Sequence, residues 1–245
     1  MMRAIILSAG RGSRLLPLTD LMPKCLVPVG GRAILDHQLD ALAEAGVREA
    51  VVVAGYRHDQ VGAHLATHRP PLAVTLRFNP FWAVSSSIGS VWAARDMLGD
   101  AFCLLNGDTT LTGTILARAF SHDGEYDRAG VGLVVEPIAR ADTDDMLVHV
   151  AGDRVTAVSK SLPPEQTTHR SLGVVVAGAQ SGYLPVLDRV IAGPEGAGDG
   201  INAYHHDIVA ALARQGAVHA IVEESGGWIE IDRPKDVERW NARAR

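Results

Sequence analysis

The stretch IILSAGRGSRLLPLTDLMPKCLVPV, residues 5–29, decides how the rest of the chain is interpreted. Its apolar start predicts a buried strand, and Gly10 and Gly12 follow in a loop with almost no side-chain bulk. Backbone N–H groups of such a loop can approach an anion closely. Positive charges surround the loop on Arg11, Arg14 and Lys24. The stretch therefore predicts a phosphate-binding loop at the end of a buried strand.

Length and composition limit the class of protein. With 245 residues, of which 47% are hydrophobic, the chain can bury a sizeable core, and we expect one domain over residues 1–245. A formal charge of −5 argues against nucleic acid or an anionic membrane as a partner. The two cysteines make neither a disulfide framework nor a metal cluster. Because no apolar run has the length of a signal peptide or of a ~20-residue membrane span, we expect a cytoplasmic protein.

The first half of the chain alternates between strands and helices. A strand covered on both faces is predicted by the continuous apolar run at residues 49–54, and further strands are predicted at residues 72–78 and 101–105. Helices are predicted by the spacing of apolar residues near 34–45, 58–66 and 82–98. This order predicts an α/β fold with a Rossmann-like, mostly parallel sheet and helices on both faces.

Polar residues and glycines follow the ends of these strands, at Gly55-Tyr56, Asn79-Pro80 and Asn106-Gly107-Asp108. Because the carboxyl ends of parallel strands form the ligand crevice, we expect these segments and the opening loop to form one site. The Asp108 carboxylate suits a divalent cation beside a phosphate, but Gly-Asp is also an ordinary turn, and spacing alone does not decide. Serines near residue 85 serve either as helix caps or as donors to a base or phosphate.

The second half has a different pattern. Strand-like segments lie at residues 130–136, 146–150, 154–158 and 172–177, and Gly152-Asp153 is a hairpin turn signal. They predict a small mixed β lobe. We interpret Asp142, Thr143, Asp144 and Asp145 as a solvated acidic loop, and residues 194–200 as a flexible loop. The His205-His206 pair lacks partners at metal spacing, so we do not expect a zinc site.

Several strings together resemble a known family. The glycine pattern alone is weak, because it lacks the third glycine of a dinucleotide fingerprint and the ending of a P-loop. The specific strings are S-A-G-R-G-S-R-L at residues 8–15, P-K-C-L at 23–26, Gly107-Asp108, and W-I-E-I-D-R-P-K-D at 228–236. They resemble the signature of nucleotidyltransferases that activate sugar phosphates and alcohol phosphates, usually L-A-A-G-x-G-[ST]-R-L…P-K-x-L. The resemblance implies an enzyme with the glycosyltransferase-A-like nucleotidyltransferase fold.

Two further segments are similar to the cytidylyltransferase branch, which uses CTP with non-sugar phosphates or phosphonates. Residues 79–91, NPFWAVSSSIGSV, resemble its N-x-x-[YW]-x-x-x-N-x-x-S-[LV] segment, and RVTAVSKSL at 154–162 is similar to the inositol-phosphate enzymes. Ser86 and Ser87 stand where the phosphocholine enzymes usually have asparagine. Ser8 and Cys25 also differ from the residues that are usual in the family signature. Residues 128–177 hold no aromatic residue for a cage around a quaternary ammonium, which argues against choline, although Tyr204 and Trp228 could contribute.

The resemblance implies transfer of CMP from CTP to a small phosphate or phosphonate, with Mg²⁺ as cofactor. The expected catalytic residues are Lys24, Arg14 and Asp108, and the expected metal ligands are Asp108 and Asp232. The expected nucleotide-binding residues are Leu7, Ala9, Gly10, Arg11, Gly12, Ser13, Arg14, Lys24, Asn79, Ser85, Ser86, Ser90 and Gly107. The expected acceptor-binding residues are Lys160, Asn202, Tyr204 and Glu230. Residues 1–125 would mainly bind the nucleotide and residues 126–245 mainly the acceptor.

Alternatives stay open at this point. A uridylyl- or other nucleotidyltransferase acting on a sugar-1-phosphate would keep the fold and change the substrates. A catalytically idle, nucleotide-sensing relative is an alternative of another class, although the combination of Lys24, Arg14, Asp108 and Asp232 argues against it. A dehydrogenase is disfavoured, because the second predicted strand ends without a ribose-binding acid. The acceptor, the choice between CTP and UTP, the pathway and the formation of a homodimer are not decided by the sequence.

Overall fold

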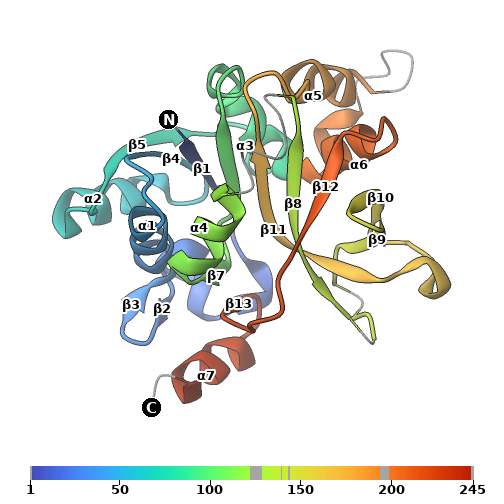
Figure 1. Ribbon diagram of the computed structural model, residues 1–245. Coiled ribbons are helices and arrows are strands. Elements are labelled where there is room, and N and C mark those ends of the chain that lie inside the picture. Colours follow the sequence, from blue (N-terminus) through green and yellow to red (C-terminus); the bar gives the residue numbers. More distant parts are fainter. Residues whose placement is uncertain (1, 122–128, 139, 143, 194–198, 244–245) are drawn as a thin grey trace.

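The computed structural model describes residues 2–121, 129–138, 140–142, 144–193 and 199–243. Within these residues one central sheet has nine strands: β1 (Arg3–Ser8), β4 (Glu49–Ala54), β5 (Ala73–Phe78), β6 (Phe102–Asn106), β8 (Val131–Pro137), β9 (Leu147–Ala151), β10 (Arg154–Ser159), β11 (His169–Ala177) and β12 (Val218–Val222). Their order is β5-β4-β1-β6-β11-β8-β12-β10-β9 (Figure 1). Strands β5, β4, β1 and β6 run parallel, and β11 is antiparallel to β6 and β8. The predicted α/β fold is confirmed.

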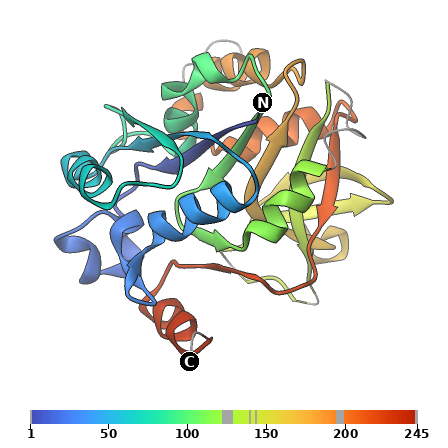
Figure 2. The same ribbon diagram turned by 60° about the vertical axis from the view of Figure 1, so that its left-hand side comes forward.

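Helices cover both faces of the sheet, because successive strand residues point to opposite faces. Ile6 of β1 belongs to a core with α1 (Ile34–Glu44), α2 (His58–His68) and α4 (Gly113–Ser121). Ile5, its neighbour, belongs to a second core with α3 (Ser87–Ala93), α5 (Tyr183–Ala192) and α6 (His205–Ala213). Figures 1 and 2 show the helices on either side of the sheet, as the apolar runs predict.

The strands of the second half extend the main sheet. β9 and β10 form the predicted hairpin, with Gly152 in its turn at φ 63°. β10 pairs with β12, and β9 pairs with the start of β11. The predicted mixed β lobe is therefore the far end of one continuous sheet and not a second sheet, since β11 bonds to β6 along one edge and to β8 along the other. The expected boundary between the halves at residues 125–126, Thr143, and residues 194–198 of the expected flexible loop lie outside the described residues.

The predicted helix over residues 82–98 is shorter than expected, because α3 begins at Ser87. The Phe81 N–H donates to the Asn79 Oδ1 at 2.9 Å, and this bond holds the preceding segment in a turn. Ile88 and Val91 fill the buried side of α3, whereas Trp92 of the same helix is 44% exposed. The turn brings the serines before α3 close to the ends of β4 and β5.

The C-terminal segment packs against the opening stretch. β13 (Trp228–Glu230) pairs with β7 (Thr109–Leu111), which follows β6 directly. α7 (Pro234–Arg243) contacts the hairpin of β2 (Pro28–Val29) and β3 (Arg32–Ala33). A third, smaller core joins these parts and contains Leu15, Val27, Val29, Ile34, Ile229 and Ile231. This core fixes the end of the chain beside the predicted phosphate-binding loop.

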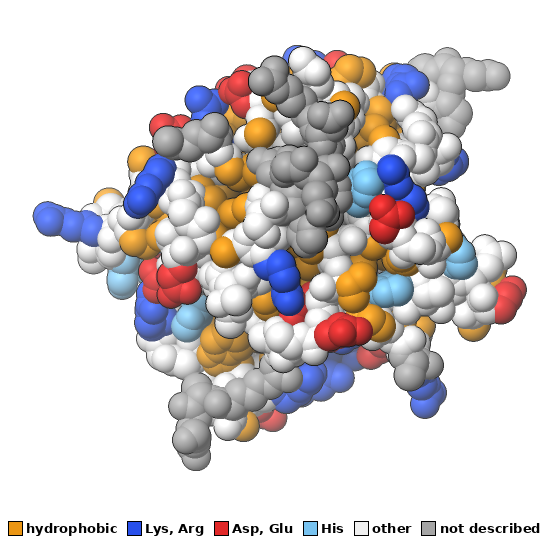
Figure 3. Space-filling model, viewed as in Figure 1, with side chains coloured by type: hydrophobic (Ala, Val, Ile, Leu, Met, Phe, Trp, Pro, Cys, Tyr) orange, Lys and Arg blue, Asp and Glu red, His pale blue; other side chains and the backbone are white. Residues whose placement is uncertain are grey.

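Two surface features bear on partners. None of the helices in the described part of the chain is long and apolar enough to cross a membrane. Among the side chains coloured in Figure 3, positive and negative groups are interspersed over the face shown. The basic residues of that face therefore do not merge into one continuous patch.

Gly107 offers a test of how closely the strand ends approach each other. A Cβ at Gly107 would lie 2.5 Å from the Leu7 carbonyl oxygen and 2.9 Å from the Ser8 Cα, whereas a Cβ at Gly99 would meet nothing within 4 Å. We expect Gly107→Ala to lower the free energy of unfolding by about 1–3 kcal/mol, because backbone atoms must move. Urea denaturation measures this change, and equal midpoints for Gly107→Ala and the control Gly99→Ala would contradict it.

Candidate active site

The carboxyl ends of β1, β4, β5 and β6 meet at one edge of the sheet, as predicted. The backbone N–H groups of Tyr56, Asn79 and Gly107 donate to the carbonyl oxygens of Ala9, Ala54 and Leu7 at 2.9, 2.8 and 3.1 Å. A pocket of about 320 Å³ lies over this edge, which is the size of a small-ligand site. A second pocket, of about 270 Å³, follows the opening loop and shares Gly10, Arg14 and Asp108 with the first.

The opening loop owes its shape to Gly12. Its φ is 71°, and a Cβ there would lie 2.9 Å from the Lys24 Cβ, so both the backbone conformation and the available space favour glycine. The Gly12 carbonyl accepts hydrogen bonds from the Leu15 N–H at 2.9 Å and from the Thr19 hydroxyl at 2.8 Å. These hydrogen bonds hold the loop in a tight turn, and the stem of Lys24 packs directly against Gly12.

Lys24 lies at the centre of a cluster of charges. Its Nζ donates to the Asp108 Oδ2 and to the Asp232 Oδ1, each at 2.7 Å. Arg14 extends the cluster, with its Nε 2.8 Å from the Asp232 Oδ2 and its Nη1 2.8 Å from the Asp144 Oδ1. Burial on its own would lower the pKa of Lys24, but Asp108 and Asp232 raise it above its usual value, so the side chain stays an ammonium. The two cations of the loop and the two predicted metal ligands therefore converge.

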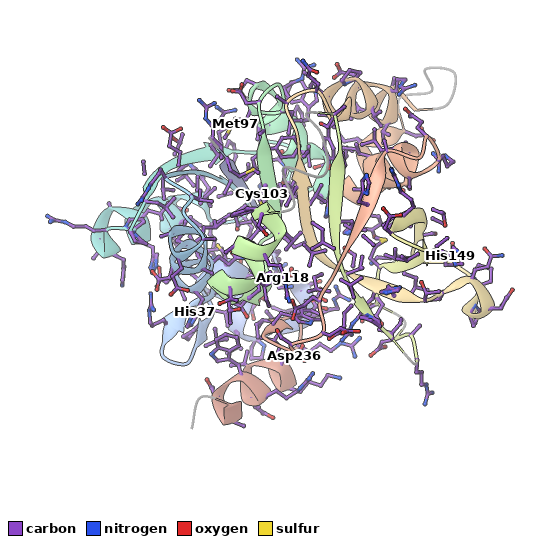
Figure 4. All side chains as sticks on the ribbon, viewed as in Figure 1. His37, Met97, Cys103, Arg118, His149 and Asp236 are labelled. Carbon is purple, nitrogen blue, oxygen red and sulfur yellow. The ribbon has the colours of Figure 1, made fainter. Side chains whose placement is uncertain are left out.

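Asp232 reaches this cluster through the pairing of β13 with β7. The Ile231 N–H donates to the Asp108 carbonyl at 2.9 Å, which ties the two acidic segments together. The carboxylate of Asp236, labelled in Figure 4 near the start of α7, accepts from the Asp232 and Arg233 N–H groups at 3.2 and 2.8 Å. The carboxylate of Asp232 is thereby left to face Lys24 and Arg14.

One carboxylate oxygen of the site lacks a hydrogen bond within the described residues. Asp108 Oδ1 is buried and has no hydrogen-bond partner among the described residues. In the same part of the chain, no group of three or more His, Cys, Asp or Glu side chains is arranged to hold a metal by itself. Mg²⁺ commonly binds one or two carboxylates and completes its shell with substrate phosphates and water. Asp108 and Asp232 therefore fit a metal that arrives with a polyphosphate.

One end of the pocket is lined by α3 and the turn before it. Asn79 is buried, and its Nδ2 donates to the Ser90 Oγ at 3.2 Å. The Ser85 hydroxyl is buried without a hydrogen-bond partner among the described residues, and Ser85 and Ser86 both line the pocket. Trp82 closes this end against Gly55, where a Cβ would lie 2.3 Å from the Trp82 Cβ. Polar groups in a narrow slot suit the edge of a planar base.

The other end of the pocket is lined by the second half of the chain. Lys160 Nζ lies 4.8 Å from the centre of the Tyr204 ring, and Arg170 lies 4.9 Å over the Trp228 ring. Each aromatic ring thus already has a cation of the protein over one face. Glu230 is exposed to the pocket and lies near other carboxylates. Loss of solvation, followed by the charges of Asp108 and Asp232, raises the pKa of Glu230 to about 8. Lys24 and Arg14 act in the opposite direction.

Comparison with known families identifies the chain at this point. Residues 4–171, which include the opening loop and Asp108, match the MobA-like NTP transferase domain. The chain belongs to this family. The predicted resemblance to the nucleotidyltransferases is confirmed.

Similar proteins act on different substrates. The chain is 30% identical over 242 residues to the CMP-5'-(3-aminopropyl)phosphonate synthase of Streptomyces rubellomurinus, with 96% of this chain and 37% of that protein covered. It is 28% identical to a mannose-1-phosphate guanyltransferase of Neurospora crassa, with 96% and 62% covered. The chain thus spans only part of these curated relatives. Its fold matches the CTP:phosphocholine cytidylyltransferase of Streptococcus pneumoniae (TM-score 0.77, 20% identity, 100% and 99% covered) and the inositol-1-phosphate CTP transferase of T. maritima (TM-score 0.78, 21%, 99% and 95%).

The structure brings most of the predicted site residues to the two pockets. Those that line one or both are Leu7, Ala9, Gly10, Gly12, Ser13, Arg14, Lys24, Asn79, Ser85, Ser86, Ser90, Gly107, Asp108, Lys160, Tyr204, Glu230 and Asp232. Arg11 and Asn202 line neither. Arg11 pairs with Asp20 at 3.1 Å, and Asn202 lies in the short turn before α6.

Sequence reasoning missed other lining residues. Asp144 and Asp145, interpreted as solvated, pair with Arg14 and Arg170 and line the pocket. His205 and His206, considered only as zinc ligands, line it as well. The signal that was present for the histidines is their chemistry, since a histidine pair is unusual at the start of an apolar helix. Their partners are far away in the chain, so spacing could not reveal them.

His205 and His206 are buried and held neutral. Burial lowers the pKa of His205 to about 4, although Asp108 acts in the opposite direction. Burial, His205 and Lys160 lower the pKa of His206 well below its usual value. The unfolded chain therefore takes up protons on these side chains below pH 6.5, while folded His205 does so only near pH 4. Protonation of the unfolded chain therefore lowers the free energy of unfolding as the pH falls from 6.5 toward 4, whereas above pH 6.5 this destabilisation is absent.

We expect this loss to be measurable as a difference between two proteins. Between pH 7.5 and 5, the wild type should lose about 2 kcal/mol more free energy of unfolding than His205→Asn, because one neutral buried imidazole is removed. Urea denaturation of both proteins at the two pH values gives the difference, in which titrating groups that do not interact with His205 cancel. Parallel pH dependences would contradict the assignment.

Proposed function

We propose that the protein transfers CMP from CTP to a small non-sugar phosphate or phosphonate, with Mg²⁺ as cofactor, and releases pyrophosphate. The observation that carries this proposal is the convergence of Lys24, Arg14, Asp108 and Asp232 at the end of β1. The choice of CTP and of a non-sugar acceptor is supported by the first relative above, a CMP-phosphonate synthase. The resemblance of residues 79–91 and 154–162 to cytidylyltransferases points the same way.

The proposed reaction needs positioning and charge compensation and no general base. An acceptor oxygen, already anionic near neutral pH, attacks the α-phosphorus. The bond to the β-phosphate oxygen breaks, and pyrophosphate leaves with the electron pair. Arg14 and the backbone from Gly10 to Ser13 would hold the β- and γ-phosphates. Lys24 would neutralise the charge that develops on the α-phosphate in the transition state.

Asp108 and Asp232 would hold the metal. Bound Mg²⁺ supplies compensation for the negative charge of the triphosphate. The two carboxylates pair with Lys24 and Arg14 in the structure. If they held the metal, Lys24 would be available for phosphate oxygens, whereas Arg14 would keep its pair with Asp144.

Lys160, Tyr204 and Glu230 would bind the acceptor at the other end of the pocket. Lys160 and Glu230 have no ion pair of their own among the described residues, and both line the pocket. A sugar-1-phosphate as acceptor remains the second candidate, supported by the guanyltransferase relatives. Phosphocholine is disfavoured, because the rings of Tyr204 and Trp228 are engaged by Lys160 and Arg170. We also propose a cytoplasmic location, supported by two cysteines that are free and buried.

A substrate panel tests the proposal. Pyrophosphate release is measured with CTP, UTP, GTP and dTTP, each with 3-aminopropylphosphonate, inositol-1-phosphate, phosphocholine and mannose-1-phosphate. We expect the highest kcat/KM for CTP with the phosphonate or the inositol phosphate, and no turnover in EDTA. A preference for the sugar phosphate would replace the proposal by the second candidate. Nucleotide binding without turnover and without Mg²⁺ would instead indicate a nucleotide sensor.

The role of Lys24 has its own test. We expect Lys24→Ala to stay folded and to lose about 10²- to 10³-fold in kcat, because a preorganised charge facing the transition state is removed. The matched control is Lys235→Ala on α7, an exposed lysine outside the proposed machinery. Circular dichroism checks the fold of each variant. A normal kcat for Lys24→Ala would remove this residue from the catalytic set.

A further inference from the structure

The first turn of α6 presents a buried polar atom to the pocket. His205 is 2% exposed and lines the pocket. Its backbone N–H donates to the Ser87 Oγ at 2.9 Å, and its Nδ1 lies 3.3 Å from the same oxygen. Its Nε2 is buried and has no hydrogen-bond partner among the described residues. A buried polar nitrogen without a partner is unfavourable, so it marks a place where a ligand atom would be bound.

Ser87 is the partner of the other ring nitrogen. Its oxygen accepts the backbone N–H of His205, and its own proton can be donated to Nδ1. In that arrangement the imidazole carries its hydrogen on Nε2 and offers a donor to the pocket. Burial keeps the ring neutral, with its pKa lowered to about 4.

A cation lies beside His205 in the pocket. The adjacent Tyr204 carries the Lys160 ammonium 4.8 Å from its ring centre, and Lys160 has no ion pair within the described residues. Lys160 is also close enough to lower the pKa of His206. The carboxylate of Asp207 already caps the N-terminus of α6, where it accepts from the Tyr204 N–H at 2.7 Å, so the cation for an incoming anion on this wall is Lys160.

We propose that His205 determines acceptor recognition, by donating from Nε2 to a phosphate or phosphonate oxygen of the acceptor that Lys160 also binds. This inference rests on the proposed function, because it assigns the second half of the pocket to the acceptor. A neutral donor has a chemical advantage over a second cation there. A neutral N–H orients the anion and withdraws less electron density from the attacking oxygen than a second cation would.

The test compares two amides at position 205. In His205→Asn the amide replaces the Nδ1 side of the ring and keeps the contact with Ser87, whereas in His205→Gln it reaches the Nε2 position. We expect the Asn variant to raise the KM of the preferred panel acceptor about 10- to 100-fold, as for loss of a hydrogen bond to a charged group. The KM for the nucleotide should stay within about threefold, and Gln should restore most of the acceptor KM. A structural role would change both KM values and the melting temperature together.

A measurement on the wild type makes the test independent of folding. In protein labelled with ¹⁵N-histidine, the spectrum should show His205 protonated at Nε2, and this signal should shift on addition of 3-aminopropylphosphonate but not of CTP alone. An unchanged signal at saturating acceptor, or an unchanged acceptor KM in a folded Asn variant, would overturn the proposal. If the wild type turned over none of the panel acceptors, the proposed function itself would fail, which is a different result.

Discussion

The ammonium group of Lys24 joins three segments that are far apart in the chain. It bonds to Asp108, 84 residues away, and to Asp232, 208 residues away, each at 2.7 Å. The three side chains are largely buried, with exposed fractions of 12%, 22% and 13%, so solvent screens their attraction less than it would at the surface. Without Lys24 the two carboxylates would face each other, and only Arg14 would offset their negative charge. The rest of the site depends on this contact, because it fixes the end of β6 and the segment after β13 against the opening loop.

The same contact determines what the nucleotide must do on binding. Arg14 and Lys24, the cations suited to phosphate, are paired with acids in the structure described here. A triphosphate can take them only if the acids gain another positive partner, since unpaired carboxylates in a partly buried site are costly. This balance is the physical argument for the metal in the proposed function, and the orphaned Asp108 Oδ1 agrees with it.

The end of the pocket lined by the second half of the chain owes its shape to an irregular strand. Strand β11 changes its register with β8 between Ser171 and Val175, and Gly173 lies in this irregular stretch at φ 71°. A Cβ on Gly173 would lie 2.3 Å from the Asn106 amide nitrogen, so glycine lets β11 approach the tip of β6. Ser171 then reaches the Nε2 of His206 at 2.9 Å. An irregular strand thus provides polar side chains where a regular one would continue the core.

The sequence by itself determined the features that depend on neighbouring residues. Continuous apolar runs predicted β1, β4 and β6, because burial on both faces is a local property. The glycines and cations of the opening loop predicted a polar pocket at the end of β1 for the same reason, since loop geometry is also local. The start of α3 was misjudged, since the Asn79 side chain overrides the apolar spacing with a turn. Only the tertiary structure decided that Asp144 meets Arg14, that the second-half strands join the main sheet, and that His205 faces the pocket. Those contacts join residues that have no short-range relation in the chain, and they form only when the sheet brings its strand ends together.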